Sequence, residues 1–491
     1  MKYDHLISIT FHNTYTYSYG KFNIFVLIAT GGCLMSVIME TMGMMFINPV
    51  AECDLHLSVT MKGYLSAANF LGVVTSSHLW GFLGDTYGRR TIVIISMVSS
   101  FTVTLISSIA PFDWMLILLR FINGLLIGGA SAVVYAYSGE FHDDNYRPKV
   151  ISWMSSFVAI GNMIIPTLAW IVLPGQWSFK IPLIDVLFKP WRLLIITYGL
   201  PTIIFAACIF SLPESPKYLL TKGKETEALL ILRKMYTINS GKSSAEFPVI
   251  RLILDEDINF TDNRGFLKLI WEQTCLLFNK RFVIVTFMVC TLQFGVFMAT
   301  SGFYMWYPEI MNRIATYERE NRAERSTICG AINYNSILRN SVNETLEPTC
   351  KEDIQPEVFT VGILMGAFFT VTYLTIGSLI NIVGKKNFLL LLFVISASSG
   401  LAAQYLSGSA IIKIFMVIDL YPTHIRAMAL AVSLMVGRFG AVSGSHVSGL
   451  IFYGICNFSY PIFAAFHIVL IVLVLLLPIS TKITKMIEPI I

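Results

Sequence analysis

Long apolar stretches recur along almost the whole chain, and they restrict it to a membrane fold. A helix needs about 20 apolar residues to cross the hydrocarbon core of a bilayer. Eleven candidate spans meet or approach that length, at residues 22–48, 61–84, 91–110, 114–137, 149–173, 192–212, 282–306, 358–381, 388–406, 427–453 and 460–480. Only 13% of the 491 residues are charged, about half the share typical of soluble domains. The sequence therefore predicts an all-α, polytopic membrane protein.

A short charged loop between the second and third candidate spans is repeated in the second half of the chain. Residues 81–90 read Gly-Phe-Leu-Gly-Asp-Thr-Tyr-Gly-Arg-Arg. Residues 377–386 carry Gly, Asn, Gly, Lys and Lys at the spacing of the Gly, Asp, Gly, Arg and Arg of the first loop, 296 residues later. Two related membrane halves that meet at a midplane cavity are typical of secondary transporters.

Six spans precede a polar segment and five or six follow it, which divides the chain into two halves. We expect an N-terminal segment, a first half, a linker with amphipathic helices, a second half and a tail, at residues 1–21, 22–212, 213–281, 282–480 and 481–491. The second half is short, because 55 residues lead from Asp85 to Glu140 but only 38 from Asn381 to Asp419. The apolar segment 409–421 is therefore predicted to be a truncated span 10.

Lysine and arginine in short loops predict the orientation, because cytosolic loops carry an excess of them. They place both termini and residues 213–281 in the cytosol, and the loop 307–357 on the exoplasmic side. Lys180, Lys189 and Arg192 are exceptions on the outward side. The exoplasmic loop holds a candidate disulfide, between Cys329 and Cys350, and a candidate glycosylation site at Asn343.

The linker contains a segment with two interpretations. Residues 225–236 place Leu229, Leu232 and Met235 at helical spacing, which predicts an amphipathic helix packed under the bundle. Residues 225–230, Glu-Thr-Glu-Ala-Leu-Leu, also match an acidic dileucine sorting signal. We prefer the amphipathic helix.

Several motifs resemble those of the major facilitator superfamily. Residues 81–90 are similar to its loop 2–3 signature, and Arg120-Phe-Ile-Asn-Gly124 is similar to its fourth-span arginine–glycine pattern. Residues 213–217, Pro-Glu-Ser-Pro-Lys, resemble the sugar-porter signature after span 6. Further likeness to the insect-type group related to synaptic vesicle glycoprotein 2 lies in residues 49–54, 152–153, 306–308 and 419–426. The resemblance implies the major facilitator fold, with two six-helix halves.

Ionisable residues within spans cost about 2.5–3.5 kcal/mol each on insertion scales, so they suggest function. Glu40 in span 1 is either a proton site or counter-charge for a cationic substrate, or a neutral carboxyl bonded to another helix. The resemblance links Arg120 in span 4 to proton coupling, and the alternative is a fixed ion pair near the surface. Arg438 in span 11 faces water, a carboxylate or an anionic substrate, or forms a structural ion pair.

Polar and aromatic residues within other spans are further candidates for binding a solute. Such groups bind organic molecules by stacking and hydrogen bonds, although they also hold membrane helices together. The candidates are Tyr135, Asn162, Gln293, Trp306 and Tyr373.

Charges near the ends of spans predict a cytosolic gate. Glu140 and Arg147 are separated by seven residues, as are Asp419 and Arg426. With the charged loop they would form ion pairs that latch the two halves on the inside. The full set of gate candidates is Gly81, Asp85, Gly88, Arg89, Arg90, Glu140, Arg147, Glu214, Asp419 and Arg426.

The function predicted from these features is secondary active transport of a small polar or charged organic solute by alternating access. An organic cation fits Glu40, whereas an organic anion or a sugar fits Arg438 or the porter signature. The chain has no Walker loop and no catalytic constellation, so we expect no enzyme activity, metal, cofactor or nucleic-acid partner. A proton or another ion would drive transport, in the plasma membrane or an intracellular vesicle. The alternative is a vesicle-membrane protein that does not transport and acts through protein partners.

Overall fold

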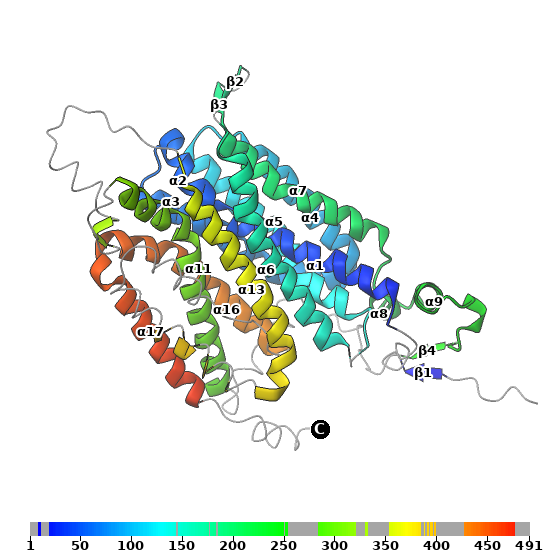
Figure 1. The fold of residues 1–491 in the computed structure, drawn as a ribbon. Helices are drawn as coiled ribbons and strands as arrows, with labels where there is room; N and C mark the ends of the chain where they lie inside the picture. Colours follow the sequence, from blue (N-terminus) through cyan, green and yellow to red (C-terminus); the bar gives the residue numbers. More distant parts are fainter. Residues whose placement is uncertain are drawn as a thin grey trace, which may run out of the picture. The chain divides into compact units, whose positions relative to one another are not determined.

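A computed structural model shows a protein that is almost entirely helical (Figure 1). It describes residues 8–10, 19–143, 146–175, 177–182, 185–249, 251–253, 283–320, 329–331, 353–383, scattered positions of 387–398, and 427–476. Within these residues, seven helices are long and apolar enough to cross a membrane. The prediction of an all-α polytopic protein is confirmed, whereas the truncated span 10 at 409–421 and both chain ends lie outside the described residues.

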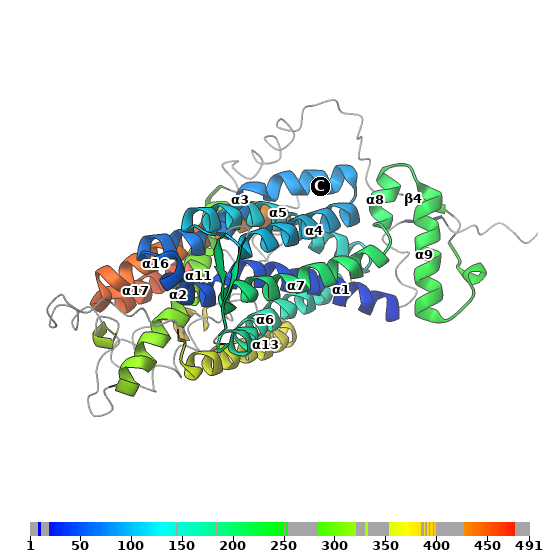
Figure 2. The same ribbon diagram turned by 90° about the horizontal axis from the view of Figure 1, so that it is seen from above.

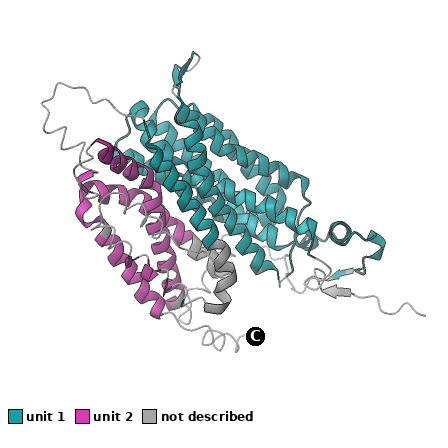
Figure 3. Cartoon of the chain, in the orientation of Figure 1, with its two compact units in different colours: residues 1–262, 349–377 teal, residues 263–348, 378–491 magenta. Residues whose placement is uncertain are grey.

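The chain forms two compact units, coloured separately in Figure 3. Unit 1 comprises residues 1–262 and 349–377, and unit 2 comprises residues 263–348 and 378–491. Most of helix α13 (Pro356–Val383) therefore groups with unit 1, although the sequence division assigns it to the second half. Glycines explain this grouping, since a Cβ at Gly366 would lie 2.5 Å from the Cα atom of Met163 in helix α6 (Arg147–Val172).

Unit 1 contains most of the helices, and their bounds agree closely with the predicted spans. They are α1 (Lys21–Met42), α2 (Met44–Leu55), α3 (Val59–Tyr87), α4 (Arg89–Ser108), α5 (Asp113–Gly139), α6 (Arg147–Val172) and α7 (Pro190–Ser211). Together α1 and α2 make the first span, interrupted at Gly43. Glycine is required there because a Cβ would lie 2.4 Å from the ring of Tyr198. The hairpin of β2 (Phe179–Ile181) and β3 (Val186–Phe188) connects α6 to α7.

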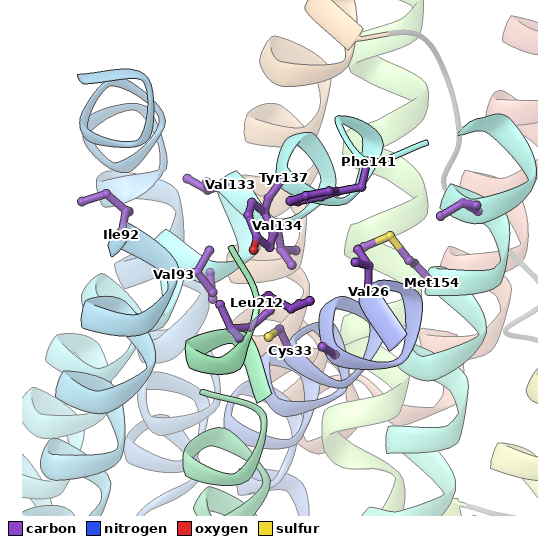
Figure 4. Close-up of a cluster of buried hydrophobic side chains, with 14 of the residues drawn as sticks. Val26, Cys33, Ile92, Val93, Val133, Val134, Tyr137, Phe141, Met154 and Leu212 are labelled. Carbon is purple, nitrogen blue, oxygen red and sulfur yellow. The ribbon is translucent and has the colours of Figure 1, made fainter. Parts of the chain in front are cut away.

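Apolar side chains fill the centre of unit 1, as the close-up in Figure 4 shows. Val26 and Cys33 of α1 lie there together with Val93 of α4 and with Val134 and Tyr137 of α5. All five are fully buried. Dense packing of this kind leaves side chains little freedom to move, so the helices of unit 1 can hold polar groups at fixed distances.

The linker after α7 begins with two helices that lie beyond the ends of the long helices (Figure 2). They are α8 (Pro216–Thr221) and α9 (Glu225–Ser240), followed by a short 3₁₀ turn (Ser244–Glu246) and by β4 (Arg251–Ile253), which pairs in parallel with β1 (Ser8–Thr10). α9 buries Leu232 and Met235, the pattern expected of an amphipathic helix. Its Leu229 packs against the core and Glu225 accepts a hydrogen bond from the Leu252 amide, so the dileucine motif is folded into the helix.

Helix α9 also holds the start of α1. The amide of Phe22 donates to Asn239 Oδ1 over 2.9 Å, and Asn239 Nδ2 donates to Asn23 Oδ1 over 2.7 Å. Asn23 Nδ2 in turn donates to the main-chain oxygen of Phe141 over 2.8 Å. The first amides of a helix have no partner inside it, and here a side chain from the linker satisfies one of them.

Unit 2 contains α11 (Val283–Glu320), α16 (Ala427–Gly454) and α17 (Cys456–Leu476). α11 and α16 approach each other closely through small residues, as membrane helices often do. A Cβ at Gly440 would lie 2.2 Å from the main-chain oxygen of Phe294, and one at Gly444 would lie 2.1 Å from that of Met298. Neither position has room for a side chain.

The prediction that residues 307–357 form a loop was wrong at its start, because α11 continues to Glu320. The sequence pattern placed the end of the span at its first polar residues. Ile310, Ile314 and Tyr317 are nevertheless buried at helical spacing, which explains why the helix continues there. Residues 321–328 and 332–352, with Asn343, lie outside the described residues.

Candidate functional site

Glu40 and Arg120 form an ion pair inside unit 1. Each side chain is 1% exposed, and Arg120 Nη1 lies 3.2 Å from Glu40 Oε2. Sequence analysis singled out both residues but did not pair them. The signal for each was an ionisable side chain within a span, and nothing in the sequence indicated that the two form a pair. Arg120 thus forms an ion pair, as the alternative interpretation expected, and its guanidinium is buried within unit 1.

Polar groups from two neighbouring helices surround this pair. Thr104 of α4 donates its hydroxyl to Glu40 Oε1 over 2.7 Å, and Arg120 Nη2 contacts the hydroxyl of Ser107. Asn69 of α3 donates to the main-chain oxygen of Glu40 over 2.6 Å. Both carboxylate oxygens therefore accept from donors, which is the arrangement that stabilises an ionised carboxylate.

The energetics of the pair favour a functional role. Burying two charges costs several kcal/mol per ion, and their attraction offsets this only with good geometry and further hydrogen bonds. An apolar pair of similar volume is often as stable or more stable. Ionisable residues at membrane depth are expensive and mark proton relays or substrate pathways. Glu40 is a group that can bind a proton, and Arg120 is the charge that would respond to it.

A second group of charges lies where α3, α4, α5 and α8 begin or end, and we call Asp85, Arg89, Glu140 and Ser215 the charged cluster. Arg89 Nη2 lies 2.9 Å from Glu140 Oε1 and 3.2 Å from Asp85 Oδ1. Ser215, the N-cap of α8, donates its hydroxyl to Glu140 Oε2 over 2.5 Å. These contacts tie the charged loop to the end of α5 and to the linker.

Glu214 and Arg90 extend the charged cluster toward the end of α7. Glu214 Oε1 accepts from the Arg90 amide over 3.0 Å, and the Arg90 guanidinium donates to the main-chain oxygen of Phe210 over 2.5 Å. Gly88 has a φ of +103°, and a Cβ there would lie 2.5 Å from Glu214 Oε2. Glycine at this position therefore permits both the left-handed turn and the approach of the carboxylate.

Burial raises the pKa of the Glu140 carboxyl above its ordinary value of 4.5, and the Arg89 guanidinium partly opposes that shift. Glu140 is 8% exposed, whereas the side chain of Asp85 is 68% exposed. The contact of Arg89 with Glu140 is therefore shielded from solvent, whereas its contact with Asp85 is not. An exposed pair contributes at most about 1 kcal/mol, so Glu140 is the principal partner of Arg89.

The remaining gate candidates differ in what surrounds them. Arg147 packs against Gly139, where a Cβ would lie 2.8 Å from Arg147 Nε, so it borders the charged cluster. Gly81 has open space around it, with nothing within 4 Å of an added Cβ. Asp419 and Arg426 lie outside the described residues, so the second-half counterpart of the gate stays a prediction.

The candidate solute-binding residues are distributed over the two units. Trp306 donates its indole N–H to the main-chain oxygen of Ser445 over 2.7 Å and packs against Gly449 and Tyr453. These contacts hold α11 to α16. Gln293 lies at the same helix contact, where a Cβ on Gly437 would lie 2.7 Å from its Cγ atom. Both residues therefore have packing roles in unit 2.

Four other candidates lie on α5, α6, α13 and α16. Tyr135 and Asn162 are half-buried on α5 and α6, and Tyr135 packs against the core of unit 1. Arg438 is half-buried on α16 and has interaction partners. Tyr373 belongs to α13, but its side chain lies outside the described residues.

The predicted disulfide partner of Cys329 was wrong. Cys329 forms a disulfide with Cys456, the first residue of α17, over an S–S distance of 2.05 Å. A Cys329–Cys350 bond was predicted because both lie in the same loop, but the bond instead joins that segment to a helix 127 residues later. Cys53 is also disulfide-bonded.

A set of ion pairs that the sequence did not predict lies at the opposite end of unit 1 from the charged cluster. Asp54 Oδ2 lies 3.3 Å from Arg192 Nη2, and its Oδ1 lies 3.4 Å from Lys189 Nζ. Glu52 Oε2 lies 2.6 Å from Lys62 Nζ. These contacts fasten α2 to α3 and α7. They also explain two exceptions to the charge rule, because Lys189 and Arg192 have a structural partner.

Comparisons with known proteins agree with this architecture. Residues 30–318 match the family model of the Major Facilitator Superfamily. Synaptic vesicle glycoprotein 2A from Pongo abelii is 27% identical over 327 residues, which cover 62% of this chain and 44% of that protein. Synaptic vesicle glycoprotein 2B from Homo sapiens is 25% identical over 324 residues, 62% and 47% of the two chains. The match thus spans less than half the length of these relatives.

Solved structures with the same fold are transporters. The xylose transporter XylE from E. coli in its inward-open conformation superposes with a TM-score of 0.61 at 15% identity, covering 93% of this chain and 96% of that one. A D-xylose–proton symporter superposes with a TM-score of 0.60 at 14% identity, covering 94% and 98%. Similarity at this level of identity establishes the fold alone.

Proposed function

We propose that this chain, which belongs to the Major Facilitator Superfamily, is a secondary transporter of a small polar or charged organic solute. The observation that carries this proposal is the buried Glu40–Arg120 ion pair, with donors at both carboxylate oxygens. A membrane protein that only scaffolds partners gains little from such a costly arrangement. A transporter that couples solute movement to a proton requires a titratable group of this kind.

The two halves, residues 22–212 and 282–480, would alternate between outward-facing and inward-facing states, joined by the cytosolic linker 213–281. The chain is a multi-pass integral membrane protein of either the plasma membrane or an intracellular vesicle, and we place both termini in the cytosol.

In the resting state Arg120 neutralises Glu40. A proton on Glu40 removes that attraction and allows α1 and α5 to rearrange. Protonation of Glu40 shifts the balance between the outward-facing and inward-facing states only to the extent that the two states differ in proton affinity.

The charged cluster would control opening at the cytosolic end. The Arg89–Glu140 contact fixes the charged loop against α5, and Ser215 connects it to the linker. We expect Arg89→Ala to shift the balance between inward-open and outward-open protein several-fold, since about 1 kcal/mol suffices for that. Distances between spin labels on the two halves measure the shift, and Gly81→Ala on α3, where an added Cβ meets nothing within 4 Å, serves as a control. If the distances between the spin labels are unchanged in Arg89→Ala, Arg89 does not control opening and only anchors this end of the protein on the cytosolic side.

Uptake into proteoliposomes tests the function directly. Purified protein is screened against sugars, organic cations and organic anions, with and without an inward proton gradient. We expect one class to accumulate, more strongly with the gradient, and Glu40→Gln to abolish the gradient effect. The glutamine keeps one acceptor oxygen, which can bind either Arg120 or Thr104 but not both, since the two contact different carboxylate oxygens. If Glu40→Gln still accumulates the solute with an unchanged pH profile, Glu40 has a structural role and is not the proton-coupling group.

The similarity to synaptic vesicle glycoproteins favours one alternative, a vesicle-membrane protein that acts through protein partners. The same assay separates the two functions. Absence of uptake for every class, from protein that is folded and correctly inserted, would support the alternative and reject the transporter.

A further inference from the structure

Asn123 has only one side-chain orientation that its surroundings permit. It is fully buried on α5, and Nδ2 lies 3.1 Å from the main-chain oxygen of Ser100 and 2.9 Å from the Ser100 hydroxyl. A carbonyl oxygen has no proton to donate, so the amide atom that faces it must be the nitrogen. The main chain of α4 therefore fixes Asn123 Nδ2 as a donor toward α4.

This orientation determines the direction of the next hydrogen bond. Asn123 Nδ2 also lies 2.8 Å from Thr104 Oγ1, to which it donates. A hydroxyl has one proton, and that of Thr104 points to Glu40 Oε1 at 2.7 Å. The chain of contacts from Ser100 through Asn123 and Thr104 thus ends in a donor aimed at the carboxylate.

We propose that Asn123 is a positioning residue that, through Thr104, sets the pH at which Glu40 binds its proton. The proposal rests on the proton coupling proposed above. A hydrogen bond to the charged form of an acid favours that form, so the fixed donor makes protonation of Glu40 harder. A proton arriving at Oε1 meets the Thr104 donor, and it therefore binds Oε2. Protonation there breaks the hydrogen bond from Arg120 Nη1, while Arg120 Nη2 stays bonded to Ser107.

Glu40 is faced by different groups from each helix packed around it. α5 brings the charge of Arg120 and the amide of Asn123, which also faces the carboxylate directly. α3 brings the Asn69 amide to the main-chain oxygen, and α7 brings the backbone at Gly199, where an added Cβ would lie 3.1 Å from Oε1. α4 brings Thr104. Arg120 supplies the charge that stabilises the carboxylate, and the Asn123–Thr104 contact supplies a neutral donor that can be removed without changing that charge.

Infrared difference spectroscopy of the full-length protein in lipid nanodiscs measures the protonation of Glu40. The carbonyl stretch of a protonated carboxyl group is followed as the pH is changed, and its absence in Glu40→Gln assigns the band. We expect Asn123→Ala and Thr104→Val each to raise the midpoint of this titration by about one pH unit, a tenfold gain in proton affinity. Thr104→Ser keeps the hydroxyl and Ser100→Ala keeps the carbonyl, so both should titrate like the wild type.

The double variant gives the decisive result. If Asn123 acts through Thr104, Asn123→Ala should shift the midpoint in the wild type but add no shift in Thr104→Val. An equal shift in both backgrounds, or no shift in folded Asn123→Ala, overturns the proposal. Should Asn123→Ala fail to fold, equal midpoints for Thr104→Val and Thr104→Ser overturn it instead.

The spectroscopic result is independent of solute uptake. A shifted titration in a protein that takes up no solute from any class overturns the transporter proposal and supports the positioning role of Asn123. Proton-coupled uptake by the wild type, together with an unshifted titration in Thr104→Val, supports the transporter proposal and overturns the positioning role of Asn123.

Discussion

At the scale of single residues, the Glu40–Arg120 pair is expected to behave as a coupled unit. Removing one partner of a buried pair typically costs about 3–5 kcal/mol, whereas an apolar replacement of both can be neutral. We expect Glu40→Leu or Arg120→Met alone to lower the thermal midpoint of the purified protein strongly, and the double variant to regain most of that loss. Additive losses in the double variant would show that the two charges do not stabilise each other.

The pH dependence of stability should reveal the state of Glu140. Burial raises the pKa of this carboxyl above 4.5, so the folded protein favours the neutral form more than the unfolded chain does. The stability from this group is then fully present below 4.5 and is lost as the pH rises through the raised folded value. We expect the thermal midpoint of the wild type, relative to Glu140→Gln, to fall over that range. If the thermal midpoint of the wild type instead rises relative to that of Glu140→Gln as the pH increases, attraction to Arg89 outweighs the cost of burying the Glu140 charge.

Residue roles could be predicted from the sequence only in part. Glu40 and Arg120 stood out because charge within a span is rare, yet the two are 80 residues apart in the chain. Nothing in the local sequence of either one specifies the other as its partner. Thr104 and Asn123 gave even less signal, because polar residues of this kind are common where membrane helices pack. Their role depends on distances between three helices.

At the scale of helices, close approach through glycine makes a sharp prediction for the contact between α3 and α5. A Cβ at Gly124 would lie 2.2 Å from the main-chain oxygen of Asn69, and backbone cannot move aside as a flexible side chain does. We expect Gly124→Ala to destabilise the protein by about 1–3 kcal/mol, the usual cost of overpacking. Gly81→Ala on α3 is the matched control and should melt like the wild type. Equal melting of both variants would refute the close contact.

Helix positions were the most predictable part of the fold, because length and apolar composition specify them directly. The error at the start of 307–357 has a local cause, since the polar residues of α11 hid the helical spacing of Ile310, Ile314 and Tyr317. The pairing of Cys329 with Cys456 has a nonlocal cause. Sequence separation favours short bridges, whereas the fold brings the start of α17 to the short helical segment at residues 329–331.

At the scale of the whole molecule, the charge distribution predicts which face meets the cytosol. The charged cluster and the linker helices α8 and α9 share one end of unit 1, while the β2–β3 hairpin belongs to the other (Figure 1). The two basic residues nearest that hairpin, Lys180 and Lys189, each pair with an aspartate. The basic residues of the linker end therefore dominate the asymmetry, which is the pattern expected of a cytosolic face.

Two exposed positions allow this orientation to be tested whichever membrane holds the protein. Lys242 follows α9 and Ser178 precedes β2, and both are exposed. We expect Lys242→Cys to react with a membrane-impermeant maleimide once digitonin has opened the plasma membrane, and not before. Ser178→Cys should react in intact cells if the protein is at the cell surface, or only after full detergent lysis if it lies in vesicles. The unmodified protein gives the background from native cysteines. Labelling of Lys242→Cys in intact cells would invert the topology and place the charged cluster on the exoplasmic side, where it could not act as a cytosolic gate.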